Sequence, residues 1–415
     1  MTVSPHVAET PPATGASRAG GEPPRAVLFT AFEPSGDDHA AAAIAGLRQM
    51  APDVKIYAWG GPKMAAAGAE VVEQTGHDAV MGMPGLKKIR EHRRINARIA
   101  RWLRANPVDV HVPVDSPAAN FPICRIARQV AGDRGLRIVH LVAPQIWAWG
   151  QWRIHKLRRL TDLVLCLLPF EEAWFKERGV PARFIGHPLF DPAHAPTPAA
   201  LEASDLADGP VRVALMPGSR PAEIAKNFPL MLPVFRSLTE DRPGLVGTVA
   251  ATTPAVAERL KNIAADHGGW PENLQMVSGR TDTVIGWCTL ALVVSGTVTL
   301  QIARQERPMV VFYKSNPLPY MLLGRWILRT EFFTLPNLIA AREIVPELVP
   351  HFAGPEPILA AARELLASPE AVARQVEELR KVVRQFGGHR AGQEAAAAIC
   401  EVLEGAPAGV PVGGT

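Results

Sequence analysis

Short apolar segments alternate with amphipathic, helix-like segments along the first half of the chain. The apolar segments lie at residues 25–31, 54–59, 108–114, 138–142 and 163–167. Strands that alternate with helices are typical of βαβ units and of a mostly parallel sheet. The pattern therefore predicts a doubly wound, Rossmann-like domain over residues 25–190.

A second series of the same kind follows a linker. Residues 184–208 are rich in Pro, Asp and Ala, as linkers are, and apolar segments at 211–216, 245–250 and 290–294 predict further strands. A second Rossmann-like domain is therefore expected over residues 191–385. The predicted fold class is α/β, with two Rossmann-like domains facing each other across a cleft at the carboxyl ends of both sheets, where ligands bind in such folds.

The two ends of the chain differ from these domains. Residues 1–24 form a Pro-, Ala- and Gly-rich arm that we expect to be disordered, and residues 386–415 are expected to hold a C-terminal helix and a flexible tail. No segment reaches the roughly 18 to 20 uninterrupted apolar residues of a membrane-spanning helix. The N-terminus also lacks the features of a secretory signal, so the sequence predicts a cytoplasmic protein.

Composition narrows the function further. A chain of 415 residues with 47% hydrophobic and 20% charged residues suits two folded domains. A formal net charge of +4 does not demand nucleic acid as a partner. The four cysteines are far apart and form no C-x-x-C pair, which predicts neither a zinc site nor a disulfide frame.

Residues 87–104, KKIREHRRINARIARWLR, carry a local excess of positive charge with apolar residues at helical spacing. One interpretation is an ordinary amphipathic helix with a solvated basic face. The other is a basic face that rests on anionic lipid headgroups. The composition of the segment fits both.

Two strand-to-helix turns in the second half are suited to phosphate. Ser295, Gly296 and Thr297 follow an apolar strand and precede a helix, whose N-terminus favours an anion. Ser219 and Arg220 follow another apolar strand, and the planar guanidinium suits phosphate oxygens. The fingerprint G-x-G-x-x-G is absent after the first strand, which favours a nucleotide-sugar donor over a hydride cofactor.

Carboxylates end two strands of the first half. Glu33 and Asp37 lie on the first turn, and Asp115 closes the segment VDVHVPVD. A carboxylate that faces the cleft could take the proton of an attacking sugar hydroxyl. The alternative is a purely structural role, with Asp37 capping the following helix.

Nine blocks, in order, resemble the lipid-A-disaccharide synthase family. They are EPSGD (33–37), GGPKMAAAG (60–68), VMGMPGLKKIR (80–90), VDSPAANF (114–121), APQIWAWGQWRIHKL (143–157), LPFEEAWFKERGVPARFIGHPL (168–189), MPGSRPAEI (216–224), VSGTVTLQ (294–301) and LPNLIAAREIVPEL (335–348). The order and number of the blocks make the resemblance specific.

The resemblance implies a metal-independent, inverting glycosyltransferase of the GT-B type that uses no cofactor. Its donor is a UDP-diacylglucosamine, its acceptor is diacylglucosamine 1-phosphate, and its products are UDP and the lipid A disaccharide 1-phosphate. Such enzymes are cytoplasmic and work at the inner leaflet of the membrane, and a homodimer is one further expectation. The resemblance favours a membrane-facing surface made of Met81, Met83, Leu86, Lys87, Lys88 and Arg90.

The resemblance also implies roles for single residues. Asp115 matches the general base, and Glu33 lies near the acceptor or the reacting sugar. The residues expected to bind the donor are Ser219, Arg220, Ser295, Gly296, Thr297 and Gln301. The acceptor or the cleft is assigned Ser35, Gly36, Asp37, Asn120, Trp147, Trp149, Asn337, Arg342 and Glu343.

Three positions depart from the family pattern. Phe32 stands where the family usually has Gly, Gln301 where it usually has Glu, and Ala118 where an acidic residue is common. These departures motivate one alternative, a divergent, non-catalytic relative that binds a UDP-sugar or a lipid. A second alternative is an enzyme similar to UDP-N-acetylglucosamine 2-epimerases, which share the two-domain architecture.

Overall fold

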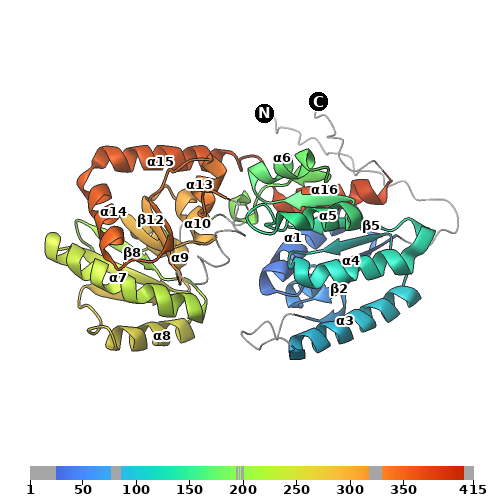
Figure 1. Cartoon of the computed structure of the whole chain (residues 1–415), viewed down its shortest axis with the longest axis horizontal. Coiled ribbons are helices and arrows are strands. Elements are labelled where there is room, and N and C mark those ends of the chain that lie inside the picture. Colours follow the sequence, from blue (N-terminus) through green and yellow to red (C-terminus); the bar gives the residue numbers. More distant parts are fainter. Residues whose placement is uncertain are drawn as a thin grey trace, which may run out of the picture.

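The computed structural model describes residues 25–75, 86–192, 195, 197, 201–316 and 330–405. Two α/β domains lie side by side, with helices around a parallel sheet in each (Figure 1). The predicted fold class, α/β with two Rossmann-like domains, is confirmed. No helix in the described part of the chain combines the length and apolarity that crossing a bilayer requires.

The sheet of the N-terminal domain has seven parallel strands in the order β3-β2-β1-β4-β5-β6-β7. Residues alternate between its two faces: Val27 and Phe29 of β1 join one apolar cluster, and Leu28 joins another. Helices must therefore cover both faces, as in doubly wound folds. The strands are β1 (Ala26–Thr30), β2 (Lys55–Gly60), β3 (Glu70–Gln74), β4 (Val110–Pro113), β5 (Arg137–Leu141), β6 (Leu163–Cys166) and β7 (Ala182–Phe184).

The helices of this domain follow its strands in alternation. They are α1 (Pro34–Met50), α2 (Pro62–Ala66), α3 (Leu86–Ala105), α4 (Pro117–Ala131), α5 (Ile154–Leu160) and α6 (Pro169–Glu177), with short 3-10 helices η1 (Gly132–Arg134), η2 (Gln151–Arg153) and η3 (Pro188–Phe190). Most of the α-helices begin with Pro in the first turn, where a missing N–H costs nothing.

The sheet of the C-terminal domain has six parallel strands in the order β10-β9-β8-β11-β12-β13. Its strands are β8 (Arg212–Met216), β9 (Val246–Ala251), β10 (Leu274–Ser278), β11 (Leu290–Val294), β12 (Met309–Lys314) and β13 (Glu347–His351). Its helices are α7 (Pro221–Asp241), α8 (Pro254–Ala265), α9 (Thr281–Trp287), α10 (Val298–Arg304), α13 (Leu335–Ala340), α14 (Glu356–Ala367) and α15 (Pro369–Arg384). Chain order reverses between β1 and β4 and between β8 and β11, which are the switch points where ligands bind in open α/β sheets.

The last helix, α16 (Ala391–Leu403), returns to the N-terminal domain and packs against α1 (Figure 1). The two helices approach closely because Gly46 and Gly392 carry no side chain: a Cβ on Gly46 would lie 2.9 Å from the Cβ of Ala396. Arg183 on β7 also donates to both carboxylate oxygens of Glu401, at 2.9 and 2.6 Å. The chain therefore crosses between the domains twice.

Side chains of both crossings pack together. Phe190 of η3 stacks on Phe386, which follows α15, with ring centroids 4.2 Å apart. Arg304 of α10 donates to the carbonyl of Leu189 at 2.6 Å and to Asp282 at 2.9 Å. These contacts tie the C-terminal domain to the linker.

Candidate active site

Asp115 lies just beyond the carboxyl end of β4, next to β1 at the switch point of the first sheet. Asp115 and Ser116 both have left-handed backbones, with φ of 46° and 39°. Residues other than glycine rarely adopt this conformation, and such strain concentrates at functional sites. The Asp115 N–H donates to the carbonyl of Leu141 on β5 at 2.9 Å, which helps to hold the turn.

A network of buried polar side chains holds the turn at Asp115 in place. The Asn120 amide donates to the carbonyls of Val114 and Asp115, both at 2.9 Å, and its oxygen accepts the Thr30 hydroxyl at 2.8 Å. The Thr30 hydroxyl donates its hydrogen to Asn120. Its oxygen therefore accepts a hydrogen bond from Nε2 of His111, which lies 2.9 Å away. Burial lowers the pKa of His111 to about 3, so this ring is neutral and protonated on Nε2. Asn120 is fully buried, and the prediction that it binds the acceptor is corrected: it positions Asp115.

Thr30→Val should lower the free energy of unfolding by about 1–3 kcal/mol, because it leaves the Asn120 oxygen and the His111 N–H buried without partners. Turnover should also fall by about tenfold or more, since small displacements of a catalytic group are costly. Thr30→Ser keeps the hydroxyl and should retain turnover. Urea unfolding and UDP-release assays measure both effects, and unchanged turnover in the Val variant would contradict this account of the network.

Glu33 lies beside Asp115. It is the N-cap residue of α1, its side chain is exposed, and one carboxylate oxygen accepts the Ser116 hydroxyl at 2.9 Å. Burial raises the pKa of the Asp115 carboxyl above its usual value; the Ser116 N–H lowers it, and the negative charge of Glu33 raises it again. A carboxylate with a raised pKa is a better proton acceptor near neutral pH.

Asp37 serves the fold of this edge. Its buried carboxylate accepts the N–H groups of Gly61, Lys63 and Met64, each at 3.1 Å, and so fixes the turn between β2 and α2. A Cβ on Gly61 would lie 2.3 Å from this carboxylate. Two expectations are therefore corrected: Asp37 neither presents its carboxylate to the cleft nor caps α1.

The neighbours of Asp37 in the same motif differ in exposure. A Cβ on Gly36 would lie 3.2 Å from the Cβ of Ala31, so this position packs closely against the residue that follows β1. Ser35 is exposed in the first turn of α1. Of the positions in EPSGD, Glu33 and Ser35 are the ones that offer polar side chains to solvent at this edge.

Arg220 faces these carboxylates from the other domain. It is the N-cap residue of α7 and donates to Glu223 at 2.9 Å, yet 78% of its side chain is exposed. The hydrogen bond and charge of Glu223 raise the pKa of Arg220, and the charge of Glu33 raises it further. The influence of Glu33 on this pKa is the smallest of those that act on Arg220, and it reaches across the domain boundary.

The two glycine-containing turns of the C-terminal domain are neighbours. β8 and β11 pair in parallel, with Met216 opposite Val293, so the turns that follow them meet at one edge. Gly218 has a φ of 97°, which lets the chain turn sharply before the exposed Ser219.

The second of these turns leads directly into α10. Gly296 and Thr297 are exposed, and a Cβ on Gly296 would meet nothing within 4 Å. Ser295 donates to the carbonyl of Phe333 at 3.3 Å, and Gln301 lies half-buried in the following turn. The sequence-predicted donor residues thus gather at the carboxyl edge of the second sheet.

The two tryptophans predicted at the cleft have different surroundings. Trp147 is buried, its indole N–H donates to Glu171 at 2.9 Å, and its ring packs edge-on against Phe170. Burial raises the pKa of Glu171 to about 7, although the indole and two backbone N–H groups favour the carboxylate. Trp147 is therefore a packing residue, which corrects its assignment to the cleft. Trp149 is exposed.

The block LPNLIAAREIVPEL is mainly structural. Asn337 is fully buried; its oxygen accepts the N–H groups of Ile344 and Val345, and its amide donates to Glu347. Its assignment as a ligand-binding residue is corrected, because all its polar atoms serve the start of β13. Arg342 pairs with Glu378 of α15, and Glu343 is exposed.

The predicted membrane-facing surface is described only in part. Met81 and Met83 lie outside the described residues, as do the side chains of Leu86, Lys87, Lys88 and Arg90 at the start of α3. Further along α3, Ile99 and Leu103 are buried in the domain and Trp102 packs edge-on against Tyr57 and Trp59. In this part of α3 the apolar side chains pack against the protein, and the outward face is basic.

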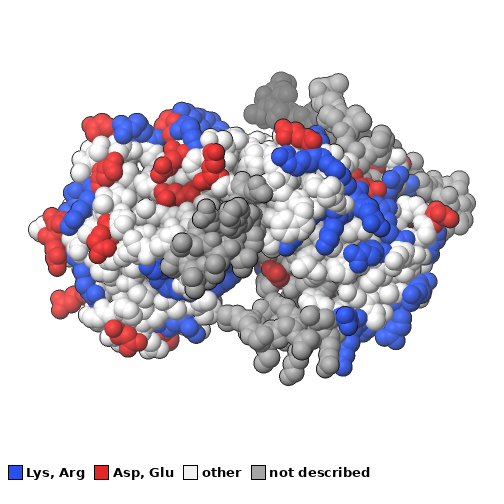
Figure 2. All heavy atoms as spheres, viewed as in Figure 1, with Lys and Arg blue, Asp and Glu red and all other residues white. Residues whose placement is uncertain are grey.

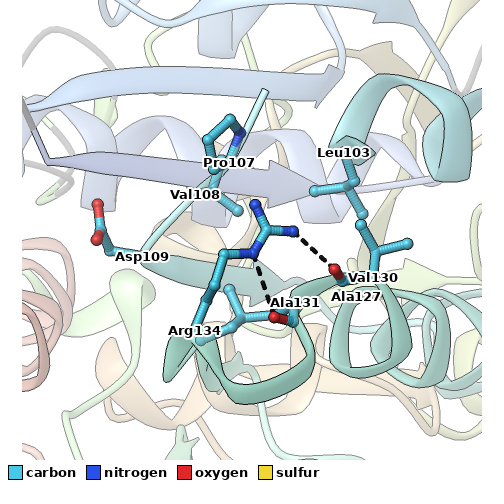
Figure 3. A pocket seen from close by; sticks show the side chains of 9 residues that line it. Leu103, Pro107, Val108, Asp109, Ala127, Val130, Ala131 and Arg134 are labelled. Atoms are coloured by element: carbon cyan, nitrogen blue, oxygen red, sulfur yellow. Dashed lines mark hydrogen bonds between the residues drawn. The ribbon is translucent and has the colours of Figure 1, made fainter. Parts of the chain in front are cut away.

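A pocket of about 300 Å³ opens at the opposite edge of the first sheet. Figure 3 shows the Arg134 guanidinium among the lining side chains, and it donates to the carbonyls of Val130 and Ala131. Val108 and Leu136 line the pocket just before β4 and β5 begin. This is the amino edge of the sheet, so the pocket is separate from Asp115. Among the described residues, no group of three or more His, Cys, Asp or Glu side chains could hold a metal ion.

Comparisons with known proteins identify the family of the chain and agree with its fold. The model of the lipid-A-disaccharide synthetase family matches residues 27–400. A lipid-A-disaccharide synthase of Pseudomonas aeruginosa (strain UCBPP-PA14) is 35% identical over 382 residues, 91% of this chain and 98% of the relative. The S. aureus MnaA-UDP co-structure is similar in fold, with a TM-score of 0.61 and 12% identity over 93% of this chain and all of that one. UDP-GlcNAc 2-epimerase from Neisseria meningitidis, bound to UDP-GlcNAc, has a TM-score of 0.55 and 10% identity over 92% of this chain and all of that one.

Proposed function

Because the chain belongs to the lipid-A-disaccharide synthase family and is a glycosyltransferase that makes the lipid A disaccharide from a UDP-sugar donor, we propose a separate catalytic role for the carboxyl edge of each sheet. The C-terminal edge holds the donor diphosphate, and the N-terminal edge supplies Asp115 as the base. The observation that carries this proposal is geometric: Asp115 and Glu33 lie at the carboxyl edge of the first sheet, and Arg220 and the Ser295 turn lie at the carboxyl edge of the second.

The donor diphosphate binds at the two adjacent turns. The N–H groups at the start of α10 and the Arg220 guanidinium give fixed dipoles and one permanent positive charge at this edge. These groups stabilise the charge that develops on UDP as it leaves.

The acceptor is diacylglucosamine 1-phosphate, which attacks through its 6-hydroxyl. As the hydroxyl oxygen forms a bond to the anomeric carbon, the bond from that carbon to the diphosphate breaks and the hydroxyl proton passes to the Asp115 carboxylate. The oxygen approaches opposite the leaving group, so the anomeric centre inverts. Glu33 and Ser116, which are hydrogen-bonded at 2.9 Å, orient the acceptor beside the base.

Both substrates carry acyl chains, so the enzyme works at the inner face of the cytoplasmic membrane. Charge supports this part of the proposal: residues 25–190 hold 23 Lys and Arg against 15 Asp and Glu, whereas residues 191–415 hold 20 against 23. Figure 2 shows Lys and Arg side chains crowded over the half of the molecule that carries α4 and α5. Such a domain is attracted to anionic lipids. The expected homodimer stays a prediction that sedimentation equilibrium would test.

The experiment that tests the proposed function is UDP release from a diacylated UDP-glucosamine with and without the lipid acceptor. Acceptor-dependent release supports the proposal. Binding without release would favour the non-catalytic alternative, and turnover of unacylated UDP-N-acetylglucosamine alone would favour an epimerase. The fold similarity to a 2-epimerase, at 10% identity, does not raise that alternative above the family match.

Gln301→Glu should leave activity intact or raise it. Gln301 lies in α10 behind the Ser295 turn, and a glutamate there would add a second acceptor oxygen for the hydroxyls of the donor ribose. The measurement is kcat/KM for the donor, with Gln301→Leu, which has no acceptor, as the control. A strong loss in the Glu variant would show that this account of the donor pocket is wrong.

A further inference from the structure

Two exposed tryptophans and one arginine form a small platform at the end of the loop that follows β5. Trp149 is 44% exposed and Trp152 is 62% exposed, which makes them unusual among the large apolar side chains of the described residues. The Arg153 guanidinium carbon lies 3.9 Å from the centroid of the Trp149 ring and 5.9 Å from that of Trp152. We call these three residues the Trp–Arg platform.

The guanidinium of the platform is held in place without being neutralised. Within the described part of the chain no carboxylate pairs with Arg153, whereas Arg98, Arg128 and Arg183 of the same domain each pair with one. A cation stacked on a ring uses its flat face, so the N–H groups along its edge stay available to an anion. Gly150, with a φ of 76°, makes room for this side chain, because a Cβ there would lie 3.3 Å from Nε of Arg153.

The platform belongs to the same sheet edge as Asp115. Its loop begins at Leu141, whose carbonyl accepts the Asp115 N–H, and ends in η2, which holds Trp152 and Arg153. Exposed Lys156 and Arg159 follow on α5. The residues around Arg153 therefore add positive charge.

This chemistry suits one class of ligand. Exposed indoles are favoured where an apolar phase meets water, at the level of lipid headgroups. A planar guanidinium with free N–H groups binds two oxygens of one phosphate. Together they fit the phosphate of a lipid whose acyl chains lie beside the rings.

We propose that the Trp–Arg platform binds the phosphate group of a lipid at the entrance to the active site. Arg153 donates to the phosphate oxygens, and Trp149 and Trp152 contact the apolar part of the same molecule. The inference rests on the proposed function in one respect, since the acceptor and the anionic phospholipids of the membrane both carry such a phosphate.

Arg153→Gln and Trp152→Ala test the proposal, and Arg134→Gln is the matched control because it removes one positive charge from the opposite edge of the same domain (Figure 3). Two arms are run with full-length protein. The first measures kcat and KM for the acceptor in detergent micelles at saturating donor. The second measures sedimentation with phosphatidylcholine vesicles, with and without phosphatidylglycerol, in the absence of substrate.

A rise in acceptor KM of about tenfold or more in the Arg153 variant, with kcat and UDP affinity kept, assigns the phosphate to the acceptor. A loss of about fivefold in binding to phosphatidylglycerol vesicles, with KM kept, assigns it to the bilayer. Variants that match the Arg134 control in both arms overturn the proposal. If the wild-type protein releases no UDP, the proposed function fails, and the vesicle arm still decides for or against the platform.

Discussion

Asp115→Asn is expected to reduce turnover by about 10² or more, the usual size of a general-base contribution, while UDP binds with nearly unchanged affinity. The amide is isosteric and keeps the strained turn, in which Asn120 donates to the Asp115 carbonyl and the Asp115 N–H donates to the Leu141 carbonyl. It cannot accept the proton of the attacking hydroxyl. Steady-state kinetics and UDP titration separate the two effects, and near-normal turnover would remove Asp115 from its role.

The pH dependence of turnover is an independent check on the role of Asp115 as the base. The base works when deprotonated, so turnover should rise with pH through the pKa of Asp115, which burial and the charge of Glu33 raise. Glu33→Gln removes that charge, lowers the pKa of Asp115 and should move the acid limb of the profile to lower pH. An acid limb that stays in place or moves to higher pH would mean that another group titrates.

Arg220→Ala is the second large effect that we expect, a loss of about 10²–10³ in turnover together with weaker UDP binding. Removing one group that stabilises developing negative charge commonly costs this much. Arg220→Lys should recover only part of the loss, because an ammonium keeps the charge but not the planar fork.

The matched control for Arg220 is Arg280→Ala. Arg280 belongs to the same domain and forms an ion pair with Asp205 at 2.6 Å. Like that of Arg220, its side chain is partly exposed. Its loss should change neither turnover nor UDP affinity. Equal UDP dissociation constants for Arg220→Ala and the wild type would exclude Arg220 from the donor site.

The apolar pattern predicted the strands that are buried on both faces. β1, β4, β6, β8 and β11 consist almost wholly of buried residues and were expected at their observed positions. The strands that the pattern did not single out include β3, β7 and β13, which are short or half-exposed and mix polar with apolar residues. Because edge and outer strands bury less, their composition does not separate them from loops. β12 is different: MVVFYK is an apolar segment, and its signal could have been found.

The sequence predicted the motifs of the site better than the roles of the single residues within them. Glu33, Asp115 and Arg220 lie just after the ends of strands, as the sequence predicted. In contrast, Asp37, Asn120 and Asn337 stabilise turns through hydrogen bonds that only the folded structure reveals. A motif shows that a residue type is needed at a position, and it does not say whether the need is chemical or structural.

Two structural contributors were missed for a physical reason. His111 is a polar residue inside an apolar strand, which was a signal, whereas Thr30 is a common strand residue. The contact between these side chains joins neighbouring strands far apart in sequence. Arg153 and Trp152 stand in a family block, but the stacking of Arg153 on Trp149 depends on the turn at Gly150.

The most direct test is a crystal structure of the enzyme with UDP. We expect the pyrophosphate within hydrogen-bonding distance of the Gly296 and Thr297 backbone and the Arg220 guanidinium, with the Asp115 carboxylate open to the space beside it. A nucleotide bound to the N-terminal sheet, or at the pocket beside Arg134, would contradict it.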